Sequence, residues 1–389
     1  MRILQVFNES RGPKGGEEKI IEHILDLMDK RSIEVGLLTK SSKTLDQNFI
    51  GKFKAFYNGI YSRNSYRTIN ECIDNYHPDV VHVHRIYPLF SPSILVACKK
   101  KNVPVVMSVH NMFFTCPVYY HFNNGHLCER CIGGREYHCI IQNCRNNIFE
   151  SIAYSIRASF ARKLSLFHNN CTLFISPSLY IKRKLIEAGF QSNRVHFLPN
   201  PVAIKNIPKT IKNGDYIAFV GRISPEKGIN IVLDAARMTN LPFEIAGNHF
   251  QLNELECKLP QNVKYRGYLI GNDLRNFYES SRAVLVPSLC PEAFCLVAAE
   301  ALAHGKPVIA SRLGALPEIV EDGKSGFLFD PSNFNDLLRK IEILWNNIEL
   351  SIQMGKYGKE SVSRNNNETL FADKLIEIYE RAIHIHTKL

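Results

Sequence analysis

The chain has 389 residues, of which 45% are hydrophobic and 22% charged, and this composition excludes an intrinsically disordered protein. Its length favours two domains of about 190 residues each over a single one. No stretch approaches the roughly 18 consecutive apolar residues that a membrane-spanning helix needs. The N-terminus, MRILQVFNES, enters a strand-like run at once, so we expect no secretory signal peptide.

The net charge of +11 comes entirely from the first half of the chain. Residues 1–200 carry 26 Lys and Arg against 15 Asp and Glu, whereas residues 201–389 carry 22 against 22. A basic half of this kind suits anionic lipid headgroups or a polyanionic acceptor, and a solvated basic surface without a partner is the alternative. No nucleic-acid recognition motif accompanies the charge, so we expect no nucleic-acid partner.

The first predicted elements are a strand at residues 2–7 and a helix with apolar spacing from Ile20 onward. They are joined by a glycine-rich turn that contains Gly12, Gly15 and Gly16. Glycine lets the backbone approach a ligand closely at a helix N-terminus, although a plain strand-to-helix turn has the same composition.

Two further apolar runs, residues 78–84 and 104–110, are predicted to be buried strands of a parallel sheet. Ligands of such sheets bind beyond the carboxyl ends of the strands, and His110 with Asn111 follows one of these strands. His110 is therefore a candidate site residue, with a purely structural hydrogen-bonding role as the alternative.

Residues 116–144 contain five cysteines and three histidines and show no helix or strand period. The spacing of Cys128 and Cys131 is typical of zinc knuckles, and Cys139 or Cys144 together with Cys116 could complete a tetrahedral site. A structural zinc ion would order a loop of this length, because metal-binding free energy becomes folding free energy. Reduced thiols and a disulfide or redox role are the alternatives.

Residues 148–164 are predicted to form an amphipathic helix. Its apolar stripe recurs every four residues at Ile148, Ile152, Ile156, Phe160 and Leu164. We expect this stripe to pack against the core, with membrane contact through the basic face of the helix as the alternative.

A polar stretch that ends near residue 215 is the predicted linker between the two domains. The strand that follows, residues 216–220, leads to Arg222, and a helix begins just after Lys227. Both cations emerge at the carboxyl edge of a second sheet, where they could neutralise a diphosphate leaving group. Isolated surface charge is the alternative.

Residues 282–331 predict one strand–helix–strand unit of a parallel sheet, with strands at 283–287 and 307–310. If the helix between them begins near Phe294, its N-terminus can attract a phosphate. The backbone N–H groups at that end belong to Phe294, Cys295 and Leu296.

Two glutamates, Glu292 and Glu300, bracket the start of this helix. Glu300 lies about 9 Å along the axis, where a carboxylate can accept hydrogen bonds from the diol of a ribose. Glu292 lies on the other side of the phosphate position, where it can hold the hydroxyls of a sugar. An anion site between two such carboxylates describes a sugar-nucleotide pocket, and solvated surface charge is the alternative.

The stretch VPS…PEAFCLVAAEALAHGKPVIAS…GALPEIVEDGKSGFLF resembles the donor-binding signature of glycosyltransferase family 4 almost position by position. The resemblance extends over nearly the whole chain and is strongest over residues 216–330. It implies the GT-B fold, an α/β architecture in which two Rossmann-like, doubly wound domains face a central cleft. It also implies sugar transfer with retention at the anomeric carbon. The chain has no Asp-x-Asp motif, so we expect no catalytic metal.

The resemblance implies a role for each motif residue. His110 and Glu292 orient the sugar as the catalytic residues, and Glu300 binds the ribose. The donor diphosphate is surrounded by the helix N-terminus at residues 294–296 and by Gly15, Gly16, Arg222 and Lys227. Two positions depart from the family: Cys295 stands where glycine is usual, and Asn111 stands where aspartate is frequent.

A similar Cys-rich insert occurs in a subset of the family. Its recurring pattern favours a structural zinc site formed by Cys116, Cys128, Cys131 and Cys144.

We therefore expect an acceptor-binding domain at residues 1–200, with its insert at 116–144, and a nucleotide-sugar-binding domain at 201–368. A helix at 369–389 should cross back to the first domain. The predicted function is transfer of a hexose-type sugar from a nucleotide-diphosphate sugar to a glycan acceptor in surface polysaccharide synthesis of the O-antigen or capsule type, and we expect this acceptor to be lipid-linked. A cytoplasmic enzyme, peripheral on the inner face of the plasma membrane, fits the basic first half. A same-fold epimerase or phosphorylase, or a catalytically silent nucleotide-sugar-binding scaffold, is the alternative.

Overall fold

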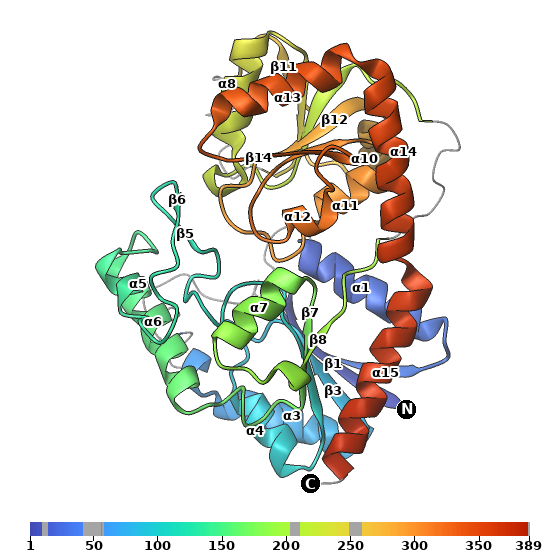
Figure 1. The fold of residues 1–389 in the computed structure, drawn as a ribbon. Helices are drawn as coiled ribbons and strands as arrows, with labels where there is room; N and C mark the ends of the chain where they lie inside the picture. Colours follow the sequence, from blue (N-terminus) through green and yellow to red (C-terminus); the bar gives the residue numbers. More distant parts are fainter. Residues whose placement is uncertain (10–14, 42–55, 57, 203–210, 249–258, 388–389) are drawn as a thin grey trace. The chain divides into compact units, whose positions relative to one another are not determined.

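The computed structural model describes residues 1–9, 15–41, 56, 58–202, 211–248 and 259–387 (Figure 1). Gly12 of the glycine-rich turn lies outside the described residues. The contacts divide the chain into two compact units. Unit 1 comprises Met1–His121, Cys128–Pro201 and Glu368–Leu389, and unit 2 comprises Phe122–Leu127 and Val202–Asn367.

Unit 1 is built on a parallel six-stranded sheet in the order β2-β1-β3-β4-β7-β8. Its strands are β1 (Arg2–Glu9), β2 (Glu34–Ser41), β3 (Val80–Val83), β4 (Val105–Ser108), β7 (Leu173–Ser176) and β8 (Val195–Phe197). Its helices are α1 (Gly16–Asp29), α3 (Arg63–Tyr76), α4 (Ser93–Lys100), α5 (His138–Ile141), α6 (Ile148–Lys163), α7 (Leu179–Glu187) and α15 (Glu368–Thr387). Strands β3, β4 and β7 are buried along their whole length, which explains their continuous apolar sequences.

The C-terminal helix α15 packs on unit 1, as predicted. The Tyr379 hydroxyl lies 2.6 Å from Nδ1 of His82 on β3, and both side chains are buried. Near the start of α15, Glu368 lies 2.7 Å from His23 of α1, and Asp373 pairs with Arg31 at 2.6 Å. The last helix is therefore fastened to the first unit by polar contacts at its beginning and its middle.

Unit 2 repeats this architecture with a parallel sheet in the order β11-β10-β9-β12-β13-β14. Its strands are β9 (Tyr216–Val220), β10 (Phe243–Ala246), β11 (Val263–Tyr265), β12 (Ser281–Val286), β13 (Val308–Ser311) and β14 (Gly326–Phe329). Its helices are α8 (Ile229–Thr239), α10 (Gly271–Ser280), α11 (Leu296–Ala303), α12 (Leu316–Ile319), α13 (Phe334–Asn346) and α14 (Ile348–Asn365). Two doubly wound α/β units confirm the predicted fold class.

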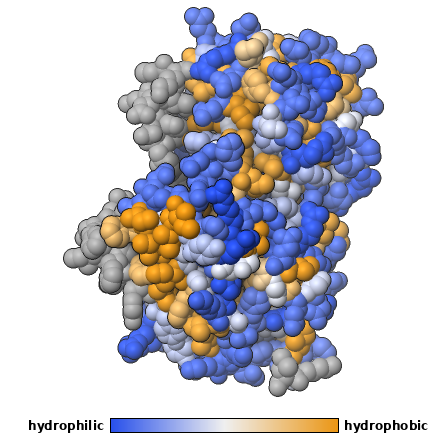
Figure 2. All heavy atoms as spheres, turned by 60° about the vertical axis from the view of Figure 1, so that its left-hand side comes forward, coloured by the Kyte–Doolittle hydropathy of each residue, from blue (hydrophilic) through white to orange (hydrophobic). Residues whose placement is uncertain are grey.

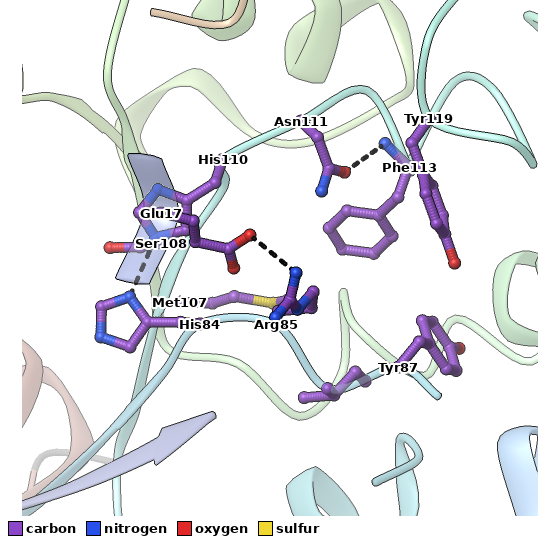
Figure 3. A pocket seen from close by; sticks show the side chains of 11 residues that line it. Glu17, His84, Arg85, Tyr87, Met107, Ser108, His110, Asn111, Phe113 and Tyr119 are labelled. Atoms are coloured by element: carbon purple, nitrogen blue, oxygen red, sulfur yellow. Dashed lines mark hydrogen bonds and ion pairs between the residues drawn. The ribbon is translucent and has the colours of Figure 1, made fainter. Parts of the chain in front are cut away.

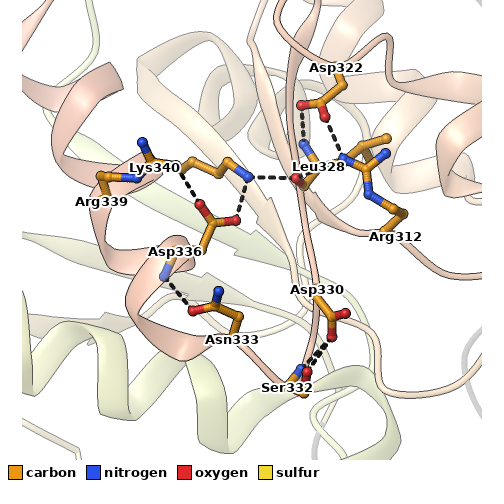
Figure 4. Close-up of polar contacts among 9 residues, drawn as sticks. All are labelled: Arg312, Asp322, Leu328, Asp330, Ser332, Asn333, Asp336, Arg339 and Lys340. Carbon is orange, nitrogen blue, oxygen red and sulfur yellow. Dashed lines mark hydrogen bonds and ion pairs between the residues drawn. The ribbon is translucent and has the colours of Figure 1, made fainter.

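The connection from β14 to α13 shows how local polar contacts fix an edge element of unit 2 (Figure 4). The Asn333 side chain accepts a hydrogen bond from the backbone N–H of Asp336 at 3.0 Å and so caps α13. Lys340, one turn further, donates to the Leu328 carbonyl at 2.7 Å. Helix α13 is thereby held against strand β14.

The predicted core packing of the 148–164 stripe is wrong. Ile148, Ile156, Phe160 and Leu164 are exposed, and Ile152 is half-buried. The buried positions of α6 are Ser151, Ser155, Arg157 and Ala161. The helix faces unit 1 with its small and polar side chains, because these bond to the preceding insert: Ser155 donates to the Glu136 carbonyl at 2.9 Å. The apolar stripe consequently points outward.

Candidate functional site

In unit 2 the topological switch point lies between β9 and β12. The chain passes from β9 to β10 and β11 on one side and then returns to β12 on the other. Ligands of such sheets bind in the crevice beyond the strand ends at this point. The loop after β9 carries Arg222 and Lys227, and the loop after β12 carries Glu292. Three of the predicted site residues therefore come from the two loops that border the switch point.

Backbone contacts join these two loops. The Leu289 N–H donates to the Glu226 carbonyl at 2.9 Å. Gly228, which follows Lys227, has a φ of 78°, and a Cβ there would lie 2.0 Å from the Pro287 carbonyl oxygen. Only glycine fits this close approach. The positions of Lys227 and of the loop that carries Glu292 are thus set together.

Lys227 and Glu292 form an ion pair at the switch point. The Lys227 Nζ lies 2.6 Å from Oε1 of Glu292, and the Ser288 hydroxyl donates to the same oxygen at 2.6 Å. Burial alone would lower the pKa of Lys227, but the Glu292 carboxylate together with the Cys290 and Cys295 side chains raises that pKa above its ordinary value. Lys227 is therefore a fixed cation. Sequence reasoning missed Ser288, which lies four residues before Glu292.

The other two charged candidates are held by separate partners. The Arg222 guanidinium lies 2.8 Å from the Glu226 carboxylate and is partly exposed. Glu300, on α11, accepts a hydrogen bond from the hydroxyl of fully buried Tyr278 at 2.9 Å. Tyr278 belongs to α10 and was not predicted. Its hydrogen bond fixes the direction in which the Glu300 carboxylate points.

Helix α11 begins later than predicted. Its first residue is Leu296 and its N-cap is Cys295, so Phe294 precedes the helix and its N–H lies outside the first turn. Cys295 has a φ of −99°, which any residue adopts, and its side chain is buried in a hydrophobic cluster with Ala298 and Ala299. The family's usual glycine is therefore not required by the backbone at this position.

Unit 1 has its own switch point, between β1 and β3, and a small pocket lies there (Figure 3). His110 lines this pocket with His84, Glu17 and Arg85, and the Arg85 guanidinium lies 3.7 Å from the Glu17 carboxylate. Of these four residues, only His110 was predicted. Gly15 and Gly16 are the N-cap and the first residue of α1, the helix that carries Glu17.

A chain of hydrogen bonds runs from His110 into the core of unit 1. His110 Nε2 lies 2.9 Å from Nδ1 of His84, and Nε2 of His84 lies 2.7 Å from Oε1 of Gln5. The Gln5 amide donates to the Tyr379 hydroxyl at 3.3 Å, which lies 2.6 Å from Nδ1 of His82. Apart from His110, these side chains are buried.

The directions of these hydrogen bonds determine which ring nitrogens of His84 and His110 carry a proton. Because the Gln5 amide nitrogen donates to Tyr379, its oxygen accepts from Nε2–H of His84. Nδ1 of a neutral His84 then accepts, so His110 donates through Nε2–H and keeps Nδ1 as an acceptor. Burial lowers the pKa of both histidines, and that of His84 falls well below its ordinary value, which keeps them neutral. His110 therefore presents a hydrogen-bond acceptor rather than a positive charge.

A larger cavity of about 390 Å³ lies beside the His110 pocket within unit 1. The two share Tyr87, Phe113 and Tyr119 in their linings. The larger cavity is mostly apolar and aromatic, with further walls from Phe114, Phe167 and Phe190. Arg157 of α6 also lines it; this buried guanidinium hydrogen-bonds to the Tyr119 hydroxyl and lies 4.1 Å from the Tyr87 ring centroid.

Comparison with known families decides the class of the protein. The model of "Glycosyltransferase Family 4" matches residues 14–206, and that of "Glycosyl transferases group 1" matches residues 203–361. The chain belongs to this family of glycosyltransferases.

Individual relatives agree with this assignment. The uncharacterized glycosyltransferase MJ1178 of Methanocaldococcus jannaschii is 28% identical over 351 residues, which cover 87% of this chain and 88% of that protein. The lipopolysaccharide 1,2-N-acetylglucosaminetransferase of Salmonella typhimurium is 30% identical over 202 residues, 44% of this chain and 53% of that enzyme. The structure of Anabaena HepE in complex with UDP superimposes with a TM-score of 0.69 at 19% identity, covering 98% of this chain and 100% of that one. This likeness establishes the GT-B fold.

The Cys-rich insert of this glycosyltransferase contains a short hairpin, β5 (Phe122–Asn123) and β6 (His126–Leu127), and the one-turn helix α5. Within the described ranges, no group of three or more His, Cys, Asp or Glu side chains is arranged to hold a metal ion. The thiol of Cys139, which is not part of the predicted zinc set, donates to the Ser151 carbonyl at 3.7 Å. The zinc set of Cys116, Cys128, Cys131 and Cys144 therefore stays a prediction that this structure does not display.

Cys144 is expected to be a more reactive thiol than Cys131 of the same insert. Interaction with the neighbouring Cys139 thiol lowers the pKa of Cys144 to about 7, whereas burial raises the pKa of Cys131 to about 12. The thiolate is the nucleophile, so alkylation of Cys144 should rise from pH 6 to pH 8 and then level off (~1 unit either side of the pKa). Peptide mapping by mass spectrometry after a short iodoacetamide pulse measures this.

Cys139→Ala serves as the matched variant, because it removes the neighbouring thiol that lowers the pKa of Cys144 and should move the labelling curve of Cys144 to higher pH. If Cys144 is labelled only after a chelator is added, the thiol is a metal ligand and the zinc prediction holds instead.

Proposed function

We propose that this glycosyltransferase moves a hexose-type sugar from a nucleotide-diphosphate sugar to a glycan acceptor with retention at the anomeric carbon. The Lys227–Glu292 pair at the switch point of unit 2 carries the proposal, because it combines a fixed cation for a diphosphate with a carboxylate for sugar hydroxyls. The UDP complex of the structural neighbour HepE supports a nucleotide-bound donor.

The proposed roles in unit 2 follow the geometry. Lys227 and Arg222 stabilise the charge that develops on the leaving diphosphate, and the first turn of α11 faces the same anion. Glu300, oriented by Tyr278, accepts hydrogen bonds from the ribose. The contacts predicted for Gly15 and Gly16 with the diphosphate remain part of the proposal.

The proposed chemistry needs no protein nucleophile. The bond between the anomeric carbon and the diphosphate oxygen breaks, and the acceptor oxygen bonds to that carbon on the same face. The acceptor proton goes to the departing phosphate. His110 accepts a hydrogen bond from a sugar or acceptor hydroxyl through Nδ1, and its contribution is positioning.

For the acceptor, we propose a lipid-linked glycan used in surface polysaccharide synthesis of the O-antigen or capsule type. The lipopolysaccharide enzyme among the relatives supports this class. The aromatic cavity beside His110 is the proposed acceptor site, because aromatic rings and one buried guanidinium suit a sugar or the first apolar units of a lipid.

No described helix is long and apolar enough to span a bilayer. We propose a cytoplasmic location at the inner face of the plasma membrane.

A thermal-shift screen against UDP-, GDP-, ADP- and dTDP-sugars tests donor binding. A ligand at 100 times its Kd should stabilise the protein by about 2.7 kcal/mol, which corresponds to a few degrees in Tm. Glu300→Ala and Arg222→Ala should lose the shift, whereas Glu342→Ala and Arg237→Ala, at exposed positions of the same unit, should keep it. If folded protein responds to none of these nucleotides, the donor site is wrong. Consumption of the donor without any acceptor would favour an epimerase, phosphorylase or hydrolase.

A further inference from the structure

The outward face of α5 and α6 is unusually apolar for a solvent-exposed surface. We call it the α5–α6 surface and define it by Ile141, Ile148, Phe149, Ile156, Phe160 and Leu164. Phe149 is 73% exposed and Ile141 is 66% exposed. Figure 2, in which α5 and α6 come forward, shows a continuous orange area on this side of unit 1. Contiguous exposed apolar patches of this kind mark interaction sites.

The orientation of α6 is fixed, so the helix cannot rotate to bury this surface. Its inner face is anchored by Arg157, which is buried, hydrogen-bonded to Tyr119 and stacked on the Tyr87 ring. Ser151 adds a hydrogen bond to the side chain of Asn143 at 3.0 Å. A buried charge moved out of these contacts would lose its partners. The apolar stripe therefore faces away from the protein, because the contacts of Arg157 and Ser151 hold the opposite face of the helix inward.

The charged side chains near the α5–α6 surface that form no ion pair within the described residues are cationic. Three carboxylates of this region each form an ion pair within the fold: Glu136 with Arg162 at 2.6 Å, Glu150 with Arg145 at 3.3 Å, and Glu129 with Lys184 at 2.9 Å. Lys184 is shared with Glu187, also at 2.9 Å. The exposed side chains of Arg130, Arg135 and Lys163 have no ion pair with a carboxylate of the described residues. The rim thus offers cations beside an apolar centre.

We propose that the α5–α6 surface docks on an anionic lipid bilayer. Apolar side chains of an interfacial helix enter the boundary between headgroups and acyl chains, while Lys and Arg at the rim meet lipid phosphates. The opposite face of α6 lines the 390 Å³ cavity through Arg157 and Ala161. Docking would bring that cavity close to the headgroups, and this last step rests on the proposed function with its lipid-linked acceptor.

Cosedimentation with vesicles tests the docking surface. The full chain should bind vesicles of phosphatidylcholine with phosphatidylglycerol and not those of phosphatidylcholine alone, and added salt should weaken the binding. Ile141→Ser with Phe149→Ser should lower the apparent affinity roughly tenfold or more, because two apolar side chains no longer leave water. Arg130→Gln with Lys163→Gln should also lower it. The matched control is Met238→Ser with Ile270→Ser, which replaces side chains that are 67% and 62% exposed in unit 2.

Three results would overturn the proposal. The wild type could fail to bind anionic vesicles, it could bind both vesicle types equally, or the control pair could lose as much affinity as Ile141→Ser with Phe149→Ser. If the wild type binds no vesicles but forms a dimer, and Ile141→Ser with Phe149→Ser dissociates that dimer, the surface binds a second copy of the chain instead. Nucleotide-induced stabilisation of the same variants reports donor binding separately, because none of the substituted side chains belongs to the donor site.

Discussion

Replacing Lys227 by methionine is expected to lower kcat/KM for sugar transfer by about 10²–10³-fold, the usual cost of removing one preorganised donor to a developing anion. Lys227 is tied to Glu292 at 2.6 Å and stands at the switch point where the leaving diphosphate should bind. Its removal also leaves the Glu292 carboxylate without its cation, which disturbs the sugar side of the same pocket. Initial rates at varied donor concentration, with the donor found in the thermal-shift screen, measure the change.

Two matched variants make this result specific. Arg237, on the next helix, is exposed and pairs with Asp234 at 2.7 Å, so Arg237→Met removes an ion-paired cation outside the proposed pocket and should leave the rate unchanged. Lys227→Arg keeps the charge and should retain more activity than the methionine variant. Full activity in folded Lys227→Met would show that the diphosphate binds elsewhere.

Replacing His110 by alanine is expected to lower kcat/KM by about 10²-fold or more, within the range of a positioned proton-accepting group. Burial lowers the pKa of His110 and keeps it neutral, and the hydrogen-bond chain through His84 and Gln5 leaves its Nδ1 as the acceptor. Alanine removes that acceptor without touching donor contacts in unit 2, so the nucleotide thermal shift should persist. Steady-state kinetics measure the loss of catalysis, and the thermal shift of the same variant measures whether donor binding is kept.

His84→Phe tests the hydrogen-bond chain that orients His110, because it keeps His110 and removes the acceptor of its Nε2–H. We expect a smaller loss of activity, roughly tenfold, as found when a residue that orients an active group is replaced. The ¹⁵N chemical shifts of labelled histidine should report Nε2–H for His110 in the wild type and a mixture of tautomers in the variant. A wild-type His110 that carries its proton on Nδ1 would contradict the assigned hydrogen-bond chain.

The residues of the proposed donor site could be named from the sequence because they stand in short motifs that resemble the family's donor-binding signature. Arg222 and Lys227 lie in the loop between β9 and α8, and Glu292 and Glu300 flank the start of α11, so the pattern of strands and helices places them at element ends. The start of α11 was two residues off, because Cys295 serves as its N-cap.

The hydrogen-bond chain from His110 through His84 and Gln5 to Tyr379 could not be predicted from local sequence patterns. Gln5 and Tyr379 are 374 residues apart in the chain and meet only because α15 returns to unit 1. His84 was within reach of sequence reasoning, since it follows β3 as His110 follows β4, and the same rule about strand ends applies to both.

The predicted orientation of α6 was wrong for a different reason. Periodicity reveals that a helix has an apolar stripe, but not the direction that the stripe faces. The inner face was decided by partners distant in sequence: Arg157 bonds to Tyr119 and stacks on Tyr87. Such contacts leave no periodic signal.

The measurement that tests the central claim most directly is transfer of an isotope-labelled sugar from its nucleotide to extracted bacterial membrane lipids, with the anomeric configuration of the product read by NMR. We expect label in the lipid fraction, in the same anomeric configuration as in the donor, with the wild type and not with Lys227→Met. An inverted product, or label that ends only as free sugar while a nucleotide is consumed, would contradict a retaining glycosyltransferase.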